Sequence, residues 1–141
     1  MNATIFDEST EIICSYSRAD AIDDGYLVDI TDAASKVGFR FPVAVTQAVW
    51  EDCIYWTDAD NDHKGICQDI RSRLQDVVTI ASLATRAARL AGTRTDWLTF
   101  SLYRVPREGK GVRPRLVALK MICSPGDNAE PVITIMLPDE D

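Results

Sequence analysis

The spacing of apolar residues along the chain changes from helical to strand-like near residue 95. Between about 66 and 91 the apolar side chains recur every three or four positions, with polar side chains on the opposite side: Ile70, Leu74, Val77, Ala81, Ala84 and Ala88. This period predicts a long amphipathic helix over about 66–91. Gly92 provides a natural end, and Arg86 and Arg89 suit the negative end of the helix dipole.

Apolar and polar residues then alternate in three segments, at about 97–105, 115–123 and 132–137. Alternation with one polar face is typical of antiparallel strands that pack on a core with one side. The simplest assembly is a three-stranded antiparallel meander with the long helix across its apolar face, an α+β fold. Should the N-terminal half leave the other face uncovered, an exposed apolar patch would form from Trp97, Tyr103, Ile122 and Met136.

The N-terminal half predicts short elements that cover the rest of the sheet. Ser17 and Asp20 have the spacing of a capping box, which marks the start of a helix. The predicted elements are helices beginning near Ser17, Thr31 and Thr46, a short strand over 26–30 and a polar loop over 58–65.

Length and composition indicate one globular domain over residues 1–141. A chain of 141 residues with 46% apolar and 26% charged residues can bury a core of its own. The N-terminus lacks the basic and apolar regions of a signal peptide, and no apolar run is long enough to span a membrane. The four cysteines are widely spaced, without a Cys-x-x-Cys pair, so we expect reduced thiols in a cytoplasmic protein with no membrane partner.

The net charge of −7 hides an uneven distribution. Residues 1–63 hold 13 acidic and 3 basic residues, residues 64–120 hold 4 acidic and 12 basic, and residues 121–141 hold 5 acidic and none basic. Two interpretations stay open: the acidic and basic segments neutralise each other in the fold, or one of them meets a charged partner.

The most basic segment connects the first two predicted strands, at 104–115. Its five basic residues face one acidic residue, Glu108; they are Arg104, Arg107, Lys110, Arg113 and Arg115. Guanidinium groups bind phosphate and carboxylate well, so these five are candidate partner-binding residues. The segment contains no aromatic residue, which argues against stacking on single-stranded bases. The alternative is a solvated hairpin or one that folds back on the acidic N-terminal half.

The acidic loop over 58–65 is a weak candidate for a metal site. Asp58, Asp60, Asp62 and Asp69 match four ligand positions of a calcium-binding loop. The pattern departs from that loop because His63 stands where a sharp turn needs glycine, and Asp69 replaces the usual glutamate. The alternative is that these carboxylates favour the positive N-terminus of the following helix.

Catalytic candidates are few, because His63 is the only histidine. A nucleophile that needs an imidazole base must use His63, and Cys67 is the nearest candidate. A zinc site made with Cys53 lacks a fourth ligand. Common catalytic and nucleotide-binding motifs are absent from the sequence. We therefore expect no cofactor and lean against an enzyme.

Four stretches of the chain, 13–30, 48–53, 102–106 and 130–138, carry a resemblance to a known family. The sequence resembles small acidic bacterial proteins encoded on plasmids, integrative elements and phage-like islands, a family with no assigned activity. The resemblance spans nearly the whole chain and implies an accessory protein of mobile DNA.

These observations favour a non-enzymatic protein that acts by binding a macromolecule. The expected partner is a protein or nucleoprotein complex, and inhibition of a host defence complex, as anti-CRISPR proteins do, is one concrete form. The alternatives are a small enzyme that depends on Cys and His or on a metal, and a DNA-binding protein that uses the basic segment 104–115. The sequence leaves the partner and the oligomeric state open.

Overall fold

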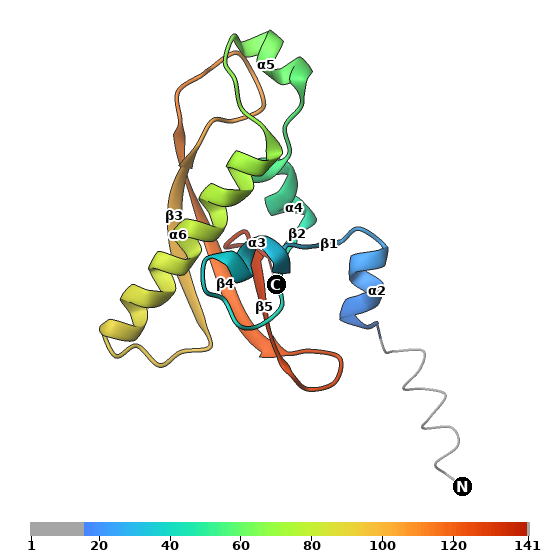
Figure 1. The fold of residues 1–141 in the computed structure, drawn as a ribbon, viewed down its shortest axis with the longest axis vertical. Coiled ribbons are helices and arrows are strands. Elements are labelled where there is room, and N and C mark those ends of the chain that lie inside the picture. The colour runs from blue at the N-terminus through green and yellow to red at the C-terminus, as the bar shows by residue number, and fades with distance from the viewer. Residues whose placement is uncertain (1–15, 141) are drawn as a thin grey trace, which may run out of the picture.

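A long helix, α6 (Ile70–Leu90), packs against a mixed β-sheet in the computed structural model, which describes residues 16–140 (Figure 1). The other helical elements are short and lie mostly in the N-terminal half: α2 (Arg18–Asp23), α3 (Thr31–Lys36), α4 (Gln47–Val49), the π-helical turn η1 (Trp50–Ile54) and α5 (Asp58–Lys64). The strands are β1 (Leu27–Asp29), β2 (Val43–Thr46), β3 (Trp97–Arg104), β4 (Arg115–Pro125) and β5 (Pro131–Met136). The α+β class is confirmed.

The predicted three-stranded meander is wrong as a description of the sheet. The sheet has five strands in the order β1-β2-β5-β4-β3, and β2 lies parallel to β5 while the other neighbours are antiparallel. The missed strand is β2, whose Val43, Ala44 and Val45 are all buried. A strand buried on both faces has no polar alternation, so its sequence gives no period-2 signal.

The helix starts expected at Ser17 and Thr46 are confirmed with their caps, whereas α3 begins at Thr31 without a side-chain cap. Ser17 Oγ accepts a hydrogen bond from the backbone N–H of Asp20, and the reciprocal bond completes the capping box. Thr46 caps α4 by accepting from the N–H of Val49. The helix that follows Thr46 widens into the π-helical turn η1, closed by a bond from the Tyr55 N–H to the Trp50 carbonyl.

The predicted loop over 58–65 is wrong, because residues 58–64 form α5. The Thr57 hydroxyl accepts from the backbone N–H of Asp60, and the Asp60 carboxylate accepts from the N–H of Thr57. Gly65 ends this helix in the left-handed conformation, at φ 68°. The long helix then begins later than expected, at Ile70, because Asp69 caps it through the N–H of Ser72.

The core lies between α6 and one face of the sheet. Val77, Val78 and Ala81 of α6 are fully buried, as are Leu119 of β4 and Ile135 of β5. Most of the stabilisation of this fold comes from removing these apolar side chains from water. No helix among residues 16–140 is long and apolar enough to cross a bilayer.

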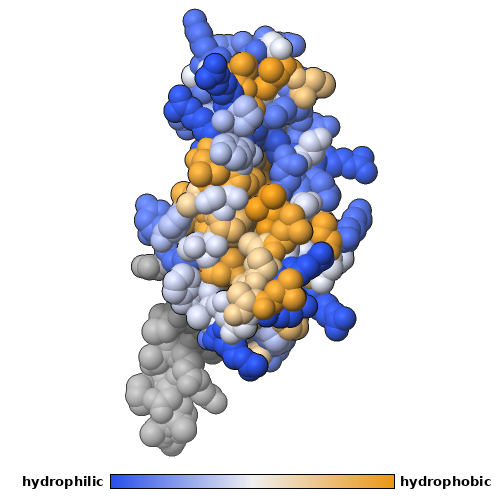
Figure 2. Space-filling view, turned by 90° about the vertical axis from the view of Figure 1, so that its left-hand side faces the viewer, coloured by the Kyte–Doolittle hydropathy of each residue, from blue (hydrophilic) through white to orange (hydrophobic). Residues whose placement is uncertain are grey.

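The opposite face of the sheet is open at its β3–β4 side. Trp97, Tyr103 and Leu116 there expose 55%, 67% and 59% of their surface. Met136 of β5, expected in the same exposed patch, is buried instead. Figure 2, which views the side of the molecule formed by α6 and β3, shows an apolar area bordered by hydrophilic residues.

Candidate interaction surface

The connection between β3 and β4 folds back against η1 and α5. Arg104 bonds both carboxylate oxygens of Asp52, at 3.0 and 3.1 Å. Arg107 donates from Nε to Asp60 at 2.8 Å, and its guanidinium lies 4.5 Å from the centre of the Tyr55 ring. Two of the five predicted partner-binding residues are therefore engaged inside the molecule, as the neutralisation alternative expected.

The carboxylate of Asp60 is the centre of this contact. Burial opposes its ionisation, but hydrogen bonds from Arg107 and Thr57 outweigh that effect and hold the pKa of Asp60 below its ordinary value. The same hydrogen bond raises the pKa of Arg107. Asp60 thus links the N-terminal cap of α5 to the segment from the end of β3 to the start of β4, residues 104–115, called here the basic connection.

A buried lysine of α5 binds the backbone of the basic connection. Lys64, at the end of α5, is only 8% exposed, and its Nζ donates to the backbone carbonyls of Glu108 and Gly111, at 3.2 and 2.5 Å. Gly109 between them adopts a left-handed conformation, at φ 67°. The lysine charge is satisfied by carbonyl dipoles, so the connection has a defined shape.

Arg73 of α6 ties the same region to the core. It is 4% exposed and lies over the Trp56 ring at 4.5 Å. Its guanidinium donates to the carbonyls of Ile54 and Val105, at 3.2 and 3.0 Å, and to the side chain of Gln68 at 2.9 Å. Burial lowers the pKa of Arg73.

Three basic side chains of the connection are not engaged by other residues of 16–140. Lys110, Arg113 and Arg115 are exposed, and their side chains form no hydrogen bond or ion pair with other residues of 16–140. They line an open hollow of about 820 Å³ beside Gly109. The predicted binding set of five thus divides into two anchors, Arg104 and Arg107, and three free cations.

The edge of the sheet next to this connection is unguarded, in the sense that its strand has neither a bulge nor a proline. β3 is the edge strand, and it pairs with β4 over eight consecutive residues without a bulge. The Asp96 carbonyl accepts from the Cys123 N–H at 2.7 Å. Because hydrogen-bonded and non-bonded pairs alternate, the backbone groups of Thr99, Ser101 and Tyr103 point away from β4.

The catalytic and metal candidates occupy other places. His63 is exposed at the end of α5, while Cys67 is exposed beyond Gly65, so no common helix brings them together. Asp58 and Asp62 are exposed on α5, and Asp69 caps α6. Within residues 16–140, no three His, Cys, Asp or Glu side chains gather as a metal cluster.

The thiol of Cys53 is unlike the other candidates because it is buried in the core. Burial, reinforced by the neighbouring Asp52, raises its pKa to about 12. A neutral thiol is a poor nucleophile and a poor zinc ligand.

Sequence reasoning missed Lys64 and Arg73. Arg73 carried a signal, since it stands three residues after Ile70 and four before Val77, on the apolar face of the helix. Lys64 carried none, because its partners are backbone carbonyls more than 40 residues away.

The sequence matches the model of a family of unknown function, DUF6573, over residues 1–141. No curated protein and no solved structure matches the chain.

Proposed function

The chain belongs to this family of unknown function, and we propose that it binds another protein along the edge strand β3. In this proposal a strand of the partner extends the sheet, and Lys110, Arg113 and Arg115 pair with acidic residues that flank that strand. The observation that carries the proposal is the unguarded edge beside three free cations.

Natural sheets protect their edges with charges, prolines, bulges or covering segments, because an open edge pairs with other chains. β3 (WLTFSLYR) contains no proline and one charged residue, Arg104, which is held by Asp52. The strand is eight residues long and pairs regularly. Such an edge is the feature that strand-addition complexes use, with backbone hydrogen bonds for affinity and side chains for specificity.

The side chains around the edge suit a protein partner. Trp97 and Tyr103 on β3 and Leu116 on β4 are more than half exposed, and aromatic residues are enriched in protein interfaces. Leu83 and Leu90 of α6 are exposed as well, and Figure 2 shows an apolar area on the side formed by α6 and β3. An apolar strip with a basic end matches a partner strand that carries acidic residues at one end.

A nucleic acid fits this surface less well. The protein has a net charge of −7, and the hollow next to Arg107 is lined by Glu51, Asp52, Asp60 and Glu108. An extended phosphate backbone would meet these acids, whereas a local acidic patch on a protein would meet only the three cations.

Host defence inhibition is the narrower form of this proposal that the family resemblance implies. A protein from plasmids or phage-like islands would dock on a protein subunit of such a complex and block it. The support for this form is the resemblance alone; the surface argues for a protein partner.

The test is affinity capture from cells that carry the gene, followed by mass spectrometry. Ser101→Pro removes an outward N–H without removing a bond to β4, and Lys110→Glu/Arg113→Glu/Arg115→Glu reverses the free cations. We expect the wild type to retain a protein that both variants lose. That protein should elute with salt, since part of the contact is ionic.

Two matched controls accompany the variants. Ser101→Thr keeps the N–H, and Arg40→Glu/Arg86→Glu/Arg89→Glu makes the same change of charge at the other end of α6; both should retain the partner. The proposal fails if no captured protein depends on Ser101 or the three cations, or if the controls lose it equally. It also fails if Ser101→Pro merely converts a homodimer to a monomer, or if duplex DNA binds at low salt and the triple reversal abolishes that binding.

A further inference from the structure

A second group of free cations surrounds a cavity at the opposite end of α6 from the basic connection. The cavity has a volume of about 530 Å³, and one wall is the segment from Val37 to Phe41 while the other is the last two turns of α6. Arg40 contributes from the first wall, and Arg86 and Arg89 from the second. All three side chains are exposed, and neither ion pair of residues 16–140 involves them.

The walls of the cavity are held in place by contacts within the fold. The Ser82 hydroxyl of α6 donates to the Val37 carbonyl at 3.0 Å and fixes the two walls to each other. Gly38 makes the turn between α3 and β2 at φ 105°, a conformation that favours glycine. Ile133 of β5, which is 9% exposed, closes the floor.

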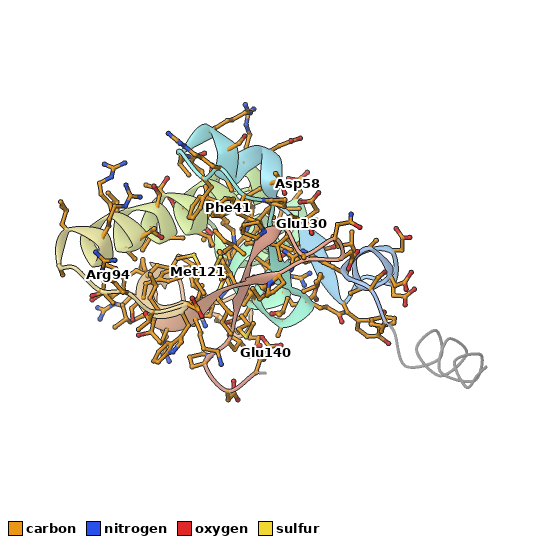
Figure 3. The ribbon with its side chains drawn as sticks, turned by 90° about the horizontal axis from the view of Figure 1, so that it is seen from below. Phe41, Asp58, Arg94, Met121, Glu130 and Glu140 are labelled. Carbon is orange, nitrogen blue, oxygen red and sulfur yellow. The ribbon has the colours of Figure 1, made fainter. Side chains whose placement is uncertain are left out.

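A smaller apolar recess lies next to this cavity. Phe41, Thr85 and Ile133 line both spaces, and the recess adds about 200 Å³. Its other side chains are mainly apolar: Trp97, Leu98, Met121 and Cys123, with Thr95 and Asp96. In Figure 3, Phe41 lies beside α6 and Arg94 lies at the end of that helix.

The charges around the two spaces are separated. Within the described residues, no Asp or Glu lines the larger cavity, whereas Asp96 is the one acid that lines the recess. A guanidinium group binds phosphate through paired N–H donors. A flat ring stacks on Phe or Trp, and a carboxylate accepts hydrogen bonds from ring amino groups. Ligand cavities in proteins have this size and this mixture of apolar walls with few polar groups.

We propose that this cavity binds a nucleoside phosphate, with the phosphates on Arg40, Arg86 and Arg89 and the base in the recess beside Phe41. The inference does not depend on the protein partner proposed for β3, because it uses other cations and touches only the first two residues of that strand, Trp97 and Leu98. Phosphate alone would use only the arginines, and an uncharged nucleoside only the recess. A nucleotide satisfies both.

The test is isothermal titration calorimetry of the full chain with ATP, GTP, AMP, inorganic triphosphate and adenosine. We expect at least one nucleotide to bind more tightly than triphosphate and adenosine. Arg40→Gln/Arg86→Gln/Arg89→Gln should weaken it by about a hundredfold, since each charged hydrogen bond contributes strongly. Phe41→Ala should weaken binding of the nucleotide but leave the affinity for triphosphate unchanged.

Lys110→Glu/Arg113→Glu/Arg115→Glu is the matched control, and it should bind the nucleotide like the wild type. Circular dichroism and thermal unfolding verify that each variant is folded, and Arg86→Gln alone serves if the triple variant unfolds. The inference is overturned if no nucleotide binds, if triphosphate binds equally well, or if loss of the three arginines changes nothing. Preference for a single-stranded oligonucleotide over every nucleotide would overturn it as well.

Discussion

Asp60 of α5 accepts a hydrogen bond of 2.8 Å from Nε of Arg107, which lies 47 residues later in the chain. The same carboxylate accepts from the backbone and hydroxyl of Thr57, at 2.9 Å each. One side chain therefore begins a helix and anchors the basic connection to it. This contact holds the connection that carries Lys110 and Arg113 against α5.

The pH dependence of stability should report this contact. The pKa of Asp60 is lowered in the folded protein by Arg107 and Thr57, against the effect of burial. Its ionised form therefore stabilises the fold above the unfolded pKa of about 4, and that stabilisation is lost as the pH falls through the lower folded pKa. Asp60→Asn should lower the urea midpoint at neutral pH, and its difference from the wild type should shrink toward pH of about 3.

Asp62→Asn is the control for this experiment, because Asp62 is exposed on the same helix. Its urea midpoint should follow the wild type at every pH. A deficit of Asp60→Asn that stays constant from neutral to acid pH would mean that the ionised carboxylate contributes nothing. Arg107→Gln should reproduce part of the deficit, since the Thr57 bonds remain.

Replacing Arg73 should destabilise the protein more than any exposed arginine does. Arg73→Met keeps an unbranched apolar stem but leaves the carbonyls of Ile54 and Val105 without their donor. The expected loss is about 3 kcal/mol of unfolding free energy, because unpaired buried polar groups are costly. Denaturant unfolding measures it.

Arg71→Met provides the comparison on the same helix. Arg71 is exposed, so its replacement should change the unfolding free energy by less than about 0.5 kcal/mol. Equal losses of unfolding free energy in the two variants would show that the hydrogen bonds of Arg73 contribute nothing to stability.

The sequence predicted the elements whose signals are local. The capping residue Ser17, the periodicity of α6 and the alternation in β3, β4 and β5 each depend on neighbours along the chain. The start of α5 could also have been predicted, since Thr57 and Asp60 have the spacing of a capping box. The similarity of the segment to a calcium-binding loop led to the prediction of a loop instead.

The missed features depend on distant parts of the chain. β2 lies between β1 and β5 in the sheet, and its parallel neighbour β5 begins only at Pro131. The pairing of Arg104 with Asp52 spans 52 residues, so charge counts indicated that acidic and basic segments could meet but not which side chains would. The cavity near Arg40 likewise exists only after α6 packs against the turn at Gly38.

The cysteines should differ sharply in reactivity. Cys53 is 1% exposed, and burial raises its pKa to about 12, whereas Cys67 and Cys123 are exposed. Since alkylation requires an accessible thiolate, iodoacetamide at mildly alkaline pH should label Cys67 and Cys123 in the native protein and spare Cys53. Peptide mapping by mass spectrometry reads each site, and labelling in urea serves as the control in which Cys53 reacts. Native labelling of Cys53 at the rate of Cys67 would show that the thiol reaches solvent, and Cys53 would return as a candidate nucleophile.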